Sequence, residues 1–183
     1  DLRIVDNLIY LNNTSGIGIY NPYSGPTIYI DGNIIINNGE GISLFGDQAL
    51  LTNNIINNNQ ACGINTKFWG GTGLSCFISE NNISNNGSYG FYGIISQATF
   101  TITNNFLKGN VNYAIYSRRG VTHTTGGQVL FNNNNILESS NYIIYNDSDF
   151  GTPDIDAENN YWGTTSDSEI QALIYDWNDD GSL

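Results

Sequence analysis

Short runs of alternating apolar and polar residues recur along the chain, separated by bends rich in asparagine and glycine. Alternation with a period of two is typical of a β-strand with one buried face, and the runs are too short for helices. Four such runs are TIYI (27–30), CFIS (76–79), TFTIT (99–103) and QVLF (128–131). The pattern therefore predicts many short strands joined by tight bends.

These strands and bends form one repeated unit. Each copy has an alternating strand, an asparagine bend, a short strand such as NII, a second polar bend and a third strand that often begins Gly-Ile. Aligning the copies on the asparagine before the central apolar residue selects Asn7, Asn33, Asn54, Asn82, Asn105, Asn135 and Asn160. The spacings, about 25 residues on average, are typical of a repeat architecture.

One copy cannot bury its apolar face alone, whereas stacked copies share a continuous core. We therefore predict an all-β parallel β-helix (β-solenoid) of about seven rungs, where a rung is one turn of the solenoid and carries three short strands. Strands of successive rungs lie about 4.8 Å apart, so equivalent asparagine side chains meet and form hydrogen-bonded ladders. Asparagine also tolerates the left-handed backbone conformation of sharp bends. Both properties explain why the chain contains 30 asparagines.

The repeat resembles the right-handed parallel β-helix, or pectin-lyase-like, superfamily, and the resemblance covers nearly the whole chain. The closing sequence AENNYWGTTSDSEIQALIYDWNDDGSL (157–183) is similar to the last segment of β-helix domains in large modular proteins of bacteria and archaea. Those proteins are secreted or displayed on the cell surface. The resemblance therefore implies an extracellular or cell-surface location, while the repeat itself says little about activity.

The C-terminal segment predicts a cap. Ile170, Leu173 and Ile174 have the spacing of an apolar helix stripe, and TSDSEI offers residues that favour a helix N-terminus. We predict rungs over 1–163 and a cap helix with an acidic turn over 164–183, within the same domain. The helix would cover the open end of the solenoid, with Tyr161 and Trp162 packed beneath it.

Charge limits the possible partners. The net charge is −12, with only five lysines and arginines, so nucleic acid is not an expected partner. No apolar run approaches the length of a membrane span, and we expect no membrane insertion. Cys62 and Cys76 flank a glycine-rich loop, and two interpretations are open: a small disulfide loop, or two buried free thiols.

Catalytic motifs are absent. The Asn-Thr-Asp, Asp-pair and His-Gly motifs of polygalacturonase-like hydrolases do not occur in this chain. Inverting hydrolysis needs two carboxylates across the scissile bond, and a calcium-dependent lyase needs a carboxylate cluster beside a basic residue. The acidic residues share no recognisable position on neighbouring rungs. We therefore expect no catalytic residues.

Two long insertions, 65–75 and 117–127, follow third strands two rungs apart and carry three of the five cations. Loops that leave one corner two rungs apart lie about 10 Å from each other. Aromatic rings beside guanidinium groups suit an acidic glycan. The candidate ligand-binding residues are Lys67, Phe68, Trp69, Tyr92, Arg118, Arg119 and His123. The alternative is that the aromatic side chains pin their own loops while the arginines are solvated.

Tyrosines recur in or after the third strands, at Tyr20, Tyr92, Tyr116 and Tyr145. They form either an outward aromatic stack or a packing ladder between rungs. Calcium is a further candidate ligand, because DWNDDG (176–181) matches the opening of a calcium loop with Asp176, Asn178 and Asp180 as ligands. The closing glutamate of such a loop would fall beyond Leu183, so a simple cap turn is the alternative.

These features together predict a non-catalytic extracellular module that serves as a rigid spacer, an adhesin or a carbohydrate-binding domain. One alternative is a polysaccharide lyase or glycoside hydrolase acting at the two insertions. Another is a self-assembling filament or surface-layer protomer that stacks end to end.

Overall fold

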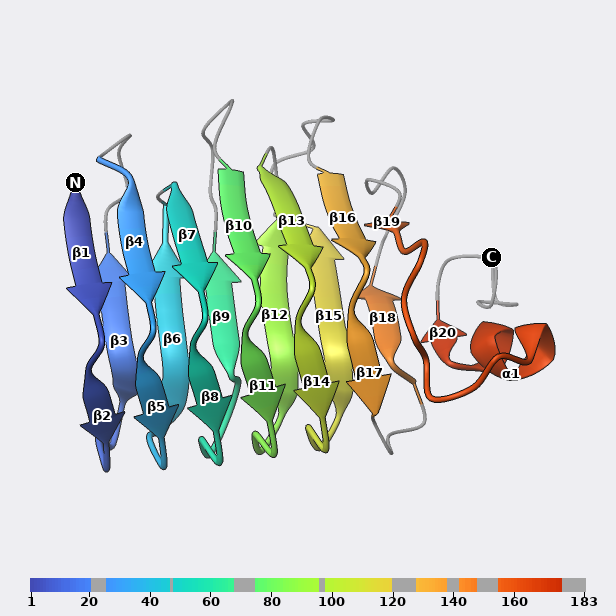
Figure 1. Cartoon of the computed structure of the whole chain (residues 1–183), viewed down its shortest axis with the longest axis horizontal. Helices are drawn as coiled ribbons and strands as arrows, with labels where there is room; N and C mark the ends of the chain where they lie inside the picture. The colour runs from blue at the N-terminus through green and yellow to red at the C-terminus, as the bar shows by residue number, and fades with distance from the viewer. Residues whose placement is uncertain are drawn as a thin grey trace.

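Figure 1 shows a chain that descends along the front of the molecule and rises along the back as it advances from the N-terminus to the C-terminus, which is a right-handed winding. The computed structural model describes residues 1–20, 26–46, 48–67, 75–95, 98–119, 128–137, 142–147 and 155–175. Three parallel sheets run along the solenoid, with seven, six and seven strands. The predicted β-solenoid of about seven rungs, with three strands per rung, is confirmed.

Each sheet takes one strand from every rung. Sheet 1 contains β1 (Leu2–Val5), β4 (Ile28–Asp31), β7 (Ala49–Thr52), β10 (Ser75–Ser79), β13 (Thr99–Thr103), β16 (Gln128–Asn132) and β19 (Ile155–Asp156). Sheet 2 contains β2 (Leu8–Tyr10), β5 (Ile34–Ile36), β8 (Ile55–Asn57), β11 (Asn82–Ser84), β14 (Phe106–Lys108) and β17 (Asn135–Leu137). Sheet 3 contains β3 (Ser15–Tyr20), β6 (Glu40–Phe45), β9 (Ile64–Lys67), β12 (Tyr89–Ile95), β15 (Tyr113–Arg119), β18 (Ile144–Asp147) and β20 (Ile174–Tyr175).

The core consists of apolar side chains stacked in columns, because paired strands keep the same register from rung to rung. In sheet 1 one fully buried column is Ile30, Leu51, Ile78, Ile102 and Phe131. In sheet 2 a second is Ile35, Ile56, Ile83, Leu107 and Ile136. Burial of one such side chain stabilises the fold by about 1.5–3 kcal/mol before entropy is counted. The alternating positions of each strand point outward and are free to carry other chemistry.

Two asparagine ladders run along the corners on either side of sheet 2. The first contains Asn7, Asn33, Asn54, Asn81, Asn105, Asn134 and Asn160. The second contains Asn12, Asn38, Asn59, Asn86 and Asn110. In both, the Nδ2 group of one asparagine donates to the Oδ1 atom of the asparagine in the next rung. The predicted ladders are therefore present.

The prediction places two members of the ladder one residue too late in the sequence. Asn82 and Asn135 are the first residues of β11 and β17, whereas the ladder passes through Asn81 and Asn134. The register is set by the inward-facing central residue of each short strand, Ile83 in β11, and not by the asparagine next to an apolar residue.

The residue before each ladder asparagine has a left-handed backbone. Examples are Asn53 before Asn54 (φ 55°) and Asn58 before Asn59 (φ 55°). L-residues other than glycine, asparagine and aspartate are strained there. The Asn-Asn pairs of the repeat therefore combine two functions, since the first residue makes the bend and the second forms the ladder.

The C-terminal end differs in part from the prediction. Helix α1 (Asp167–Ala172) ends before Leu173, and Ile174 belongs to β20, which pairs with β18 in sheet 3. Ile170, Leu173 and Ile174 all pack against the core, although only Ile170 does so from the helix. Within the described ranges no helix is long and apolar enough to cross a membrane.

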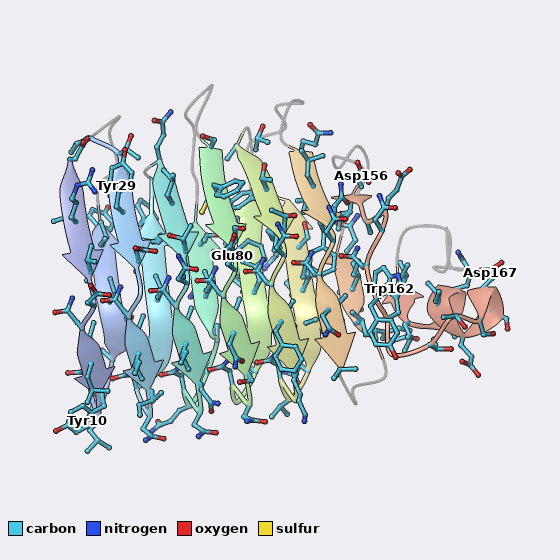
Figure 2. All side chains as sticks on the ribbon, in the orientation of Figure 1. Tyr10, Tyr29, Glu80, Asp156, Trp162 and Asp167 are labelled. Atoms are coloured by element: carbon cyan, nitrogen blue, oxygen red, sulfur yellow. The ribbon has the colours of Figure 1, made fainter. Side chains whose placement is uncertain are left out.

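Trp162 closes the core at this end. It is 8% exposed and meets the ring of Phe131 edge-to-face at 6.3 Å. Figure 2 shows it beside α1 at the end of the solenoid. Tyr161, which was expected to pack with it, is 49% exposed instead, because its backbone pairs with Asn135 and only the next side chain points inward.

The two cysteines are free thiols in the structure, not a disulfide. Cys76 lies in β10 and faces the core of sheet 1, whereas Cys62 lies at the corner that leads into β9 of sheet 3. Burial raises the pKa of Cys76 to about 12 and is the largest cause that raises the pKa of Cys62 to about 11. The buried-thiol interpretation therefore holds.

Candidate binding surface

The outward face of sheet 3 carries a column of stacked tyrosines. Tyr92, Tyr116, Tyr145 and Tyr175 occupy equivalent positions on β12, β15, β18 and β20. Their ring centroids are 5.3, 5.4 and 4.6 Å apart, with interplanar angles of 12°, 4° and 6°. The inward residues next to them, such as Phe91 and Ile115, are buried in the core. The column therefore lies on the outside of the solenoid, at the back of the view in Figure 1.

A second set of tyrosines lies against this column. Tyr89, Tyr113 and Tyr142 each precede a member of the first column by three residues. Tyr89 lies 5.0 Å from Tyr116, and Tyr113 lies 4.9 Å from Tyr145, between ring centroids. Tyr142 contacts Tyr175 at 5.4 Å. We call these seven residues the tyrosine layer, and all seven are half-buried.

The tyrosine layer is an apolar surface with polar rims. Stacked aromatic pairs stabilise by about 0.5–1.5 kcal/mol beyond the burial of area, so the rings hold one another in place. Burial, with the neighbouring Tyr89 and Tyr142, raises the pKa of Tyr113. The hydroxyl of Tyr113 therefore stays protonated at neutral pH, as a donor and acceptor of hydrogen bonds.

Two of the five cations lie next to the layer. Lys67 in β9, Ile94 in β12 and Arg118 in β15 share one register position, two residues beyond the column of Tyr92. Lys67 and Arg118 are thus two rungs apart on the face that carries the tyrosines, Arg118 being exposed and Lys67 half-buried. Tyr20 and Phe45 share the register position of Lys67 on rungs 1 and 2. Their rings stack with centroids 4.6 Å apart, and this pair is not part of the tyrosine layer.

The structure describes the remaining candidate ligand residues only in part or not at all. Arg119 is the last residue of β15, and only its backbone is described. Phe68, Trp69 and His123 lie outside the described residues, and so do Asp176, Asn178 and Asp180 of the calcium prediction. The structure therefore places Lys67, Tyr92 and Arg118 on one face and leaves the others as predictions.

Four residues of the layer escape the sequence analysis: Tyr89, Tyr113, Tyr142 and Tyr175. A signal for three of them exists, because Tyr-x-x-Tyr occurs at 89–92, 113–116 and 142–145, at the same place in three successive rungs. A spacing of three does not fit the alternation of a flat strand, which places such residues on opposite faces. The corner at the start of the third strand brings both tyrosines to the same side.

On rungs 2 and 3 the positions in register with Tyr92 carry the polar residues Ser43 and Asn65. Asn65 lies in register with Tyr92, and its Nδ2 atom donates to Oε1 of Glu40 at 2.8 Å. The Ser15 hydroxyl donates to Oε2 of the same carboxylate at 3.4 Å. Among the described residues no three histidine, cysteine or acidic side chains gather in a way that could hold a metal ion.

Comparison with known proteins identifies one family. A family model described as "Periplasmic copper-binding protein (NosD)" matches residues 1–175. No curated protein and no solved structure gives a match. The description names a compartment outside the cytoplasm and a bound metal. A location outside the cytoplasm agrees with the prediction, whereas the compartment named is the periplasm and not the extracellular space or the cell surface. Since the match covers nearly the whole chain, the chain belongs to the NosD family of periplasmic copper-binding proteins.

Proposed function

We propose that this chain is a non-catalytic binding module of the cell envelope and that its tyrosine layer binds a polysaccharide. The observation that supports the proposal is the layer itself, seven half-buried tyrosines in contact on one face of a rigid solenoid. Sugar rings combine apolar C–H faces with a rim of hydroxyl groups. Tyrosine offers the matching combination of an apolar ring and a polar tip.

The scaffold supports this function by fixing the tyrosines before a ligand arrives. Tyr92, Tyr116 and Tyr145 lie on strands that are paired on both sides, and their rings contact one another. Ordering of loose side chains on binding lowers affinity by about 0.5–1.5 kcal/mol for each one. From Tyr92 to Tyr175 the layer spans three rung spacings, about 14 Å, which suits a chain-like ligand.

The neighbouring cations add a preference for acidic sugars. A carboxylate or sulfate of a glycan that lies across the layer would meet Arg118 or Lys67, and charge-assisted hydrogen bonds to such groups are about twice as strong as neutral ones. The rest of the surface is acidic, with a net charge of −12. Selectivity for an acidic polymer therefore depends on these local cations.

The family description names copper as a ligand. The described residues of this chain do not supply the donors that a copper site needs. Soft or imidazole ligands bind copper best, yet the chain has no methionine and only one histidine. Cys76 lies in β10 and Cys62 at the corner before β9, and their raised pKa values oppose the thiolate form that binds metal. These donors do not fit a copper centre, and the proposed function uses none.

The test is electrophoresis in native gels that contain polygalacturonate, alginate, xylan or a mixed-linkage β-glucan. We expect retardation by at least one polymer. Tyr92→Ala should weaken retardation by neutral and acidic polymers alike, whereas Arg118→Ala should weaken only that by acidic ones. Migration unchanged by all four polymers would contradict carbohydrate binding and leave the module as a spacer.

A further inference from the structure

The tyrosine layer brings phenol rings from different rungs unusually close. Tyr145 on β18 and Tyr175 on β20 have the shortest centroid separation in the layer, 4.6 Å, and their planes differ by 6°. Tyr113 and Tyr145 follow at 4.9 Å, and Tyr89 and Tyr116 at 5.0 Å. Two phenol rings joined by a single carbon–carbon bond have centroids only slightly closer than the first of these distances.

We propose that the tyrosine layer is a site of oxidative modification, at which a one-electron oxidant couples Tyr145 and Tyr175 into a dityrosine bridge. Rings that already lie in contact have only to turn from the stacked to the edge-joined arrangement to form the bond. Both rings are half-buried, so a small oxidant and water reach them.

The chemistry balances as follows. Each of the two phenols gives one electron to the oxidant and its hydroxyl proton to water, which leaves two neutral phenoxyl radicals. The radicals join through ring carbons ortho to the oxygens and form one carbon–carbon bond. Each of those carbons then releases its hydrogen as a proton, and each oxygen takes up a proton again. The net change is the loss of two electrons and two protons from the pair.

Contact throughout the layer makes the product independent of where oxidation begins. An electron vacancy formed on any ring can pass to an identical neighbour, because all seven tyrosines lie in one connected set of ring contacts. The bridge then forms where the rings lie closest, at Tyr145 and Tyr175. Tyr29 in sheet 1 (Figure 2) lies outside this set, and so does the exposed Tyr161; both provide comparisons.

The bridge would fasten the C-terminal end of the solenoid. Strand β20 has two residues and pairs with β18 through Ile174 and Tyr175. Helix α1, which is also short, contacts β20 directly. A covalent link between the neighbouring strands would hold this end of the chain on the core when the two-residue pairing opens.

The experiment uses photo-oxidation of dilute protein with a ruthenium tris-bipyridine complex and persulfate. We expect dityrosine fluorescence in monomeric protein and a mass loss of two hydrogen atoms per bridge. Digestion by a protease that cuts at acidic residues should yield the peptide of Tyr145 linked to that of Tyr175. Tyr175→Phe, which keeps the packing, should remove this linked peptide, while Tyr29→Phe and Tyr161→Phe should leave its yield unchanged.

A second measurement separates proximity from intrinsic reactivity. In urea the linked peptide should disappear, because the two tyrosines are 30 residues apart in sequence and only the fold brings them together. The proposal is overturned if the oxidised monomer carries no bridge, if bridges form equally at Tyr29 or Tyr161, or if the Tyr145–Tyr175 peptide has the same yield in urea.

Discussion

The backbone N–H and the side-chain Nδ2 group of Asn54 both donate to one atom, Oδ1 of Asn81 in the next rung, each at 2.9 Å. Asn81 in turn donates in the same two ways to Asn105. Both side chains are nearly inaccessible to water, with 1% and 2% exposed. The ladder therefore satisfies the polar groups that each corner buries, and it fixes the register on which the tyrosine layer depends.

Removal of one ladder member should be strongly destabilising. Asn81→Ala leaves the backbone N–H of Asn54 and one hydrogen of its Nδ2 group without an acceptor, while Nδ2 keeps its bond to the Ile30 carbonyl. Each orphaned donor costs about 1–3 kcal/mol. We expect a loss of at least about 2 kcal/mol in the free energy of unfolding, measured by urea denaturation. Asn82→Ala is the matched control, since Asn82 lies in β11 outside the ladder, and it should cost less than about 1 kcal/mol. Equal losses would contradict the register.

Glu80 should be a site at which stability can be gained. It occupies the left-handed position before Asn81 with a φ of 59°, where the other rungs use asparagine, glycine or, at Asp6, aspartate (Figure 2). Glu80→Asn should stabilise the protein by about 0.5–1 kcal/mol, because asparagine tolerates this conformation. Glu80→Ala keeps the strain and should give no gain. A higher melting temperature for the alanine variant than for the asparagine variant would contradict this explanation.

Asp31 should make stability depend on pH in the acidic range. Hydrogen bonds from Thr52, at 2.6 Å, and from Asn53 hold the pKa of its carboxyl below the ordinary 3.8. A lowered native pKa contributes stability that is complete above the unfolded pKa and is lost as the pH falls through the native one. Asp31→Asn should therefore lose stability at pH 6 relative to the parent and lose less on acidification. Parallel losses for both proteins between pH 5 and pH 2 would rule this out.

Both cysteines should resist modification in the folded protein. Their pKa values of about 11 and about 12 leave almost no thiolate at neutral pH, and thiolate is the reactive form. Ellman's reagent should detect two thiols in denaturant and react far more slowly in buffer. Detection of no thiols after denaturation without reductant would indicate the disulfide between Cys62 and Cys76.

The architecture is predictable from sequence because every rung repeats the same physical solution. Inward positions need apolar residues and corners need asparagine or glycine. Both kinds of residue therefore recur at regular intervals along the sequence, and these intervals reveal the repeat. Individual ladder members are harder to assign where asparagines are adjacent, as at Asn81 and Asn82. There the inward-facing Ile83 decides the register.

The cap and the surface are less accessible to sequence analysis. Leu173 and Ile174 fit a helix stripe, yet β18 offers an open edge and Ile174 pairs with it. Tyr89 and Tyr92 share a face only because the chain bends at the start of β12. Alternation along a flat strand would place residues three apart on opposite faces, so the sequence pattern does not predict this arrangement. Such features depend on neighbouring rungs more than on local preference.

The most direct test of the proposed binding surface compares two tyrosine variants in one experiment. Tyr116 lies at the centre of the tyrosine layer, whereas Tyr29 lies on sheet 1, where Arg3 covers its ring at 4.4 Å. Dissociation constants of the parent, Tyr116→Ala and Tyr29→Ala should be measured by affinity electrophoresis against polygalacturonate, alginate, xylan and β-glucan. We predict at least tenfold weaker binding for Tyr116→Ala, about 1.4 kcal/mol, and no change for Tyr29→Ala. Equal affinities of all three proteins for every polymer would contradict a binding site on the tyrosine layer.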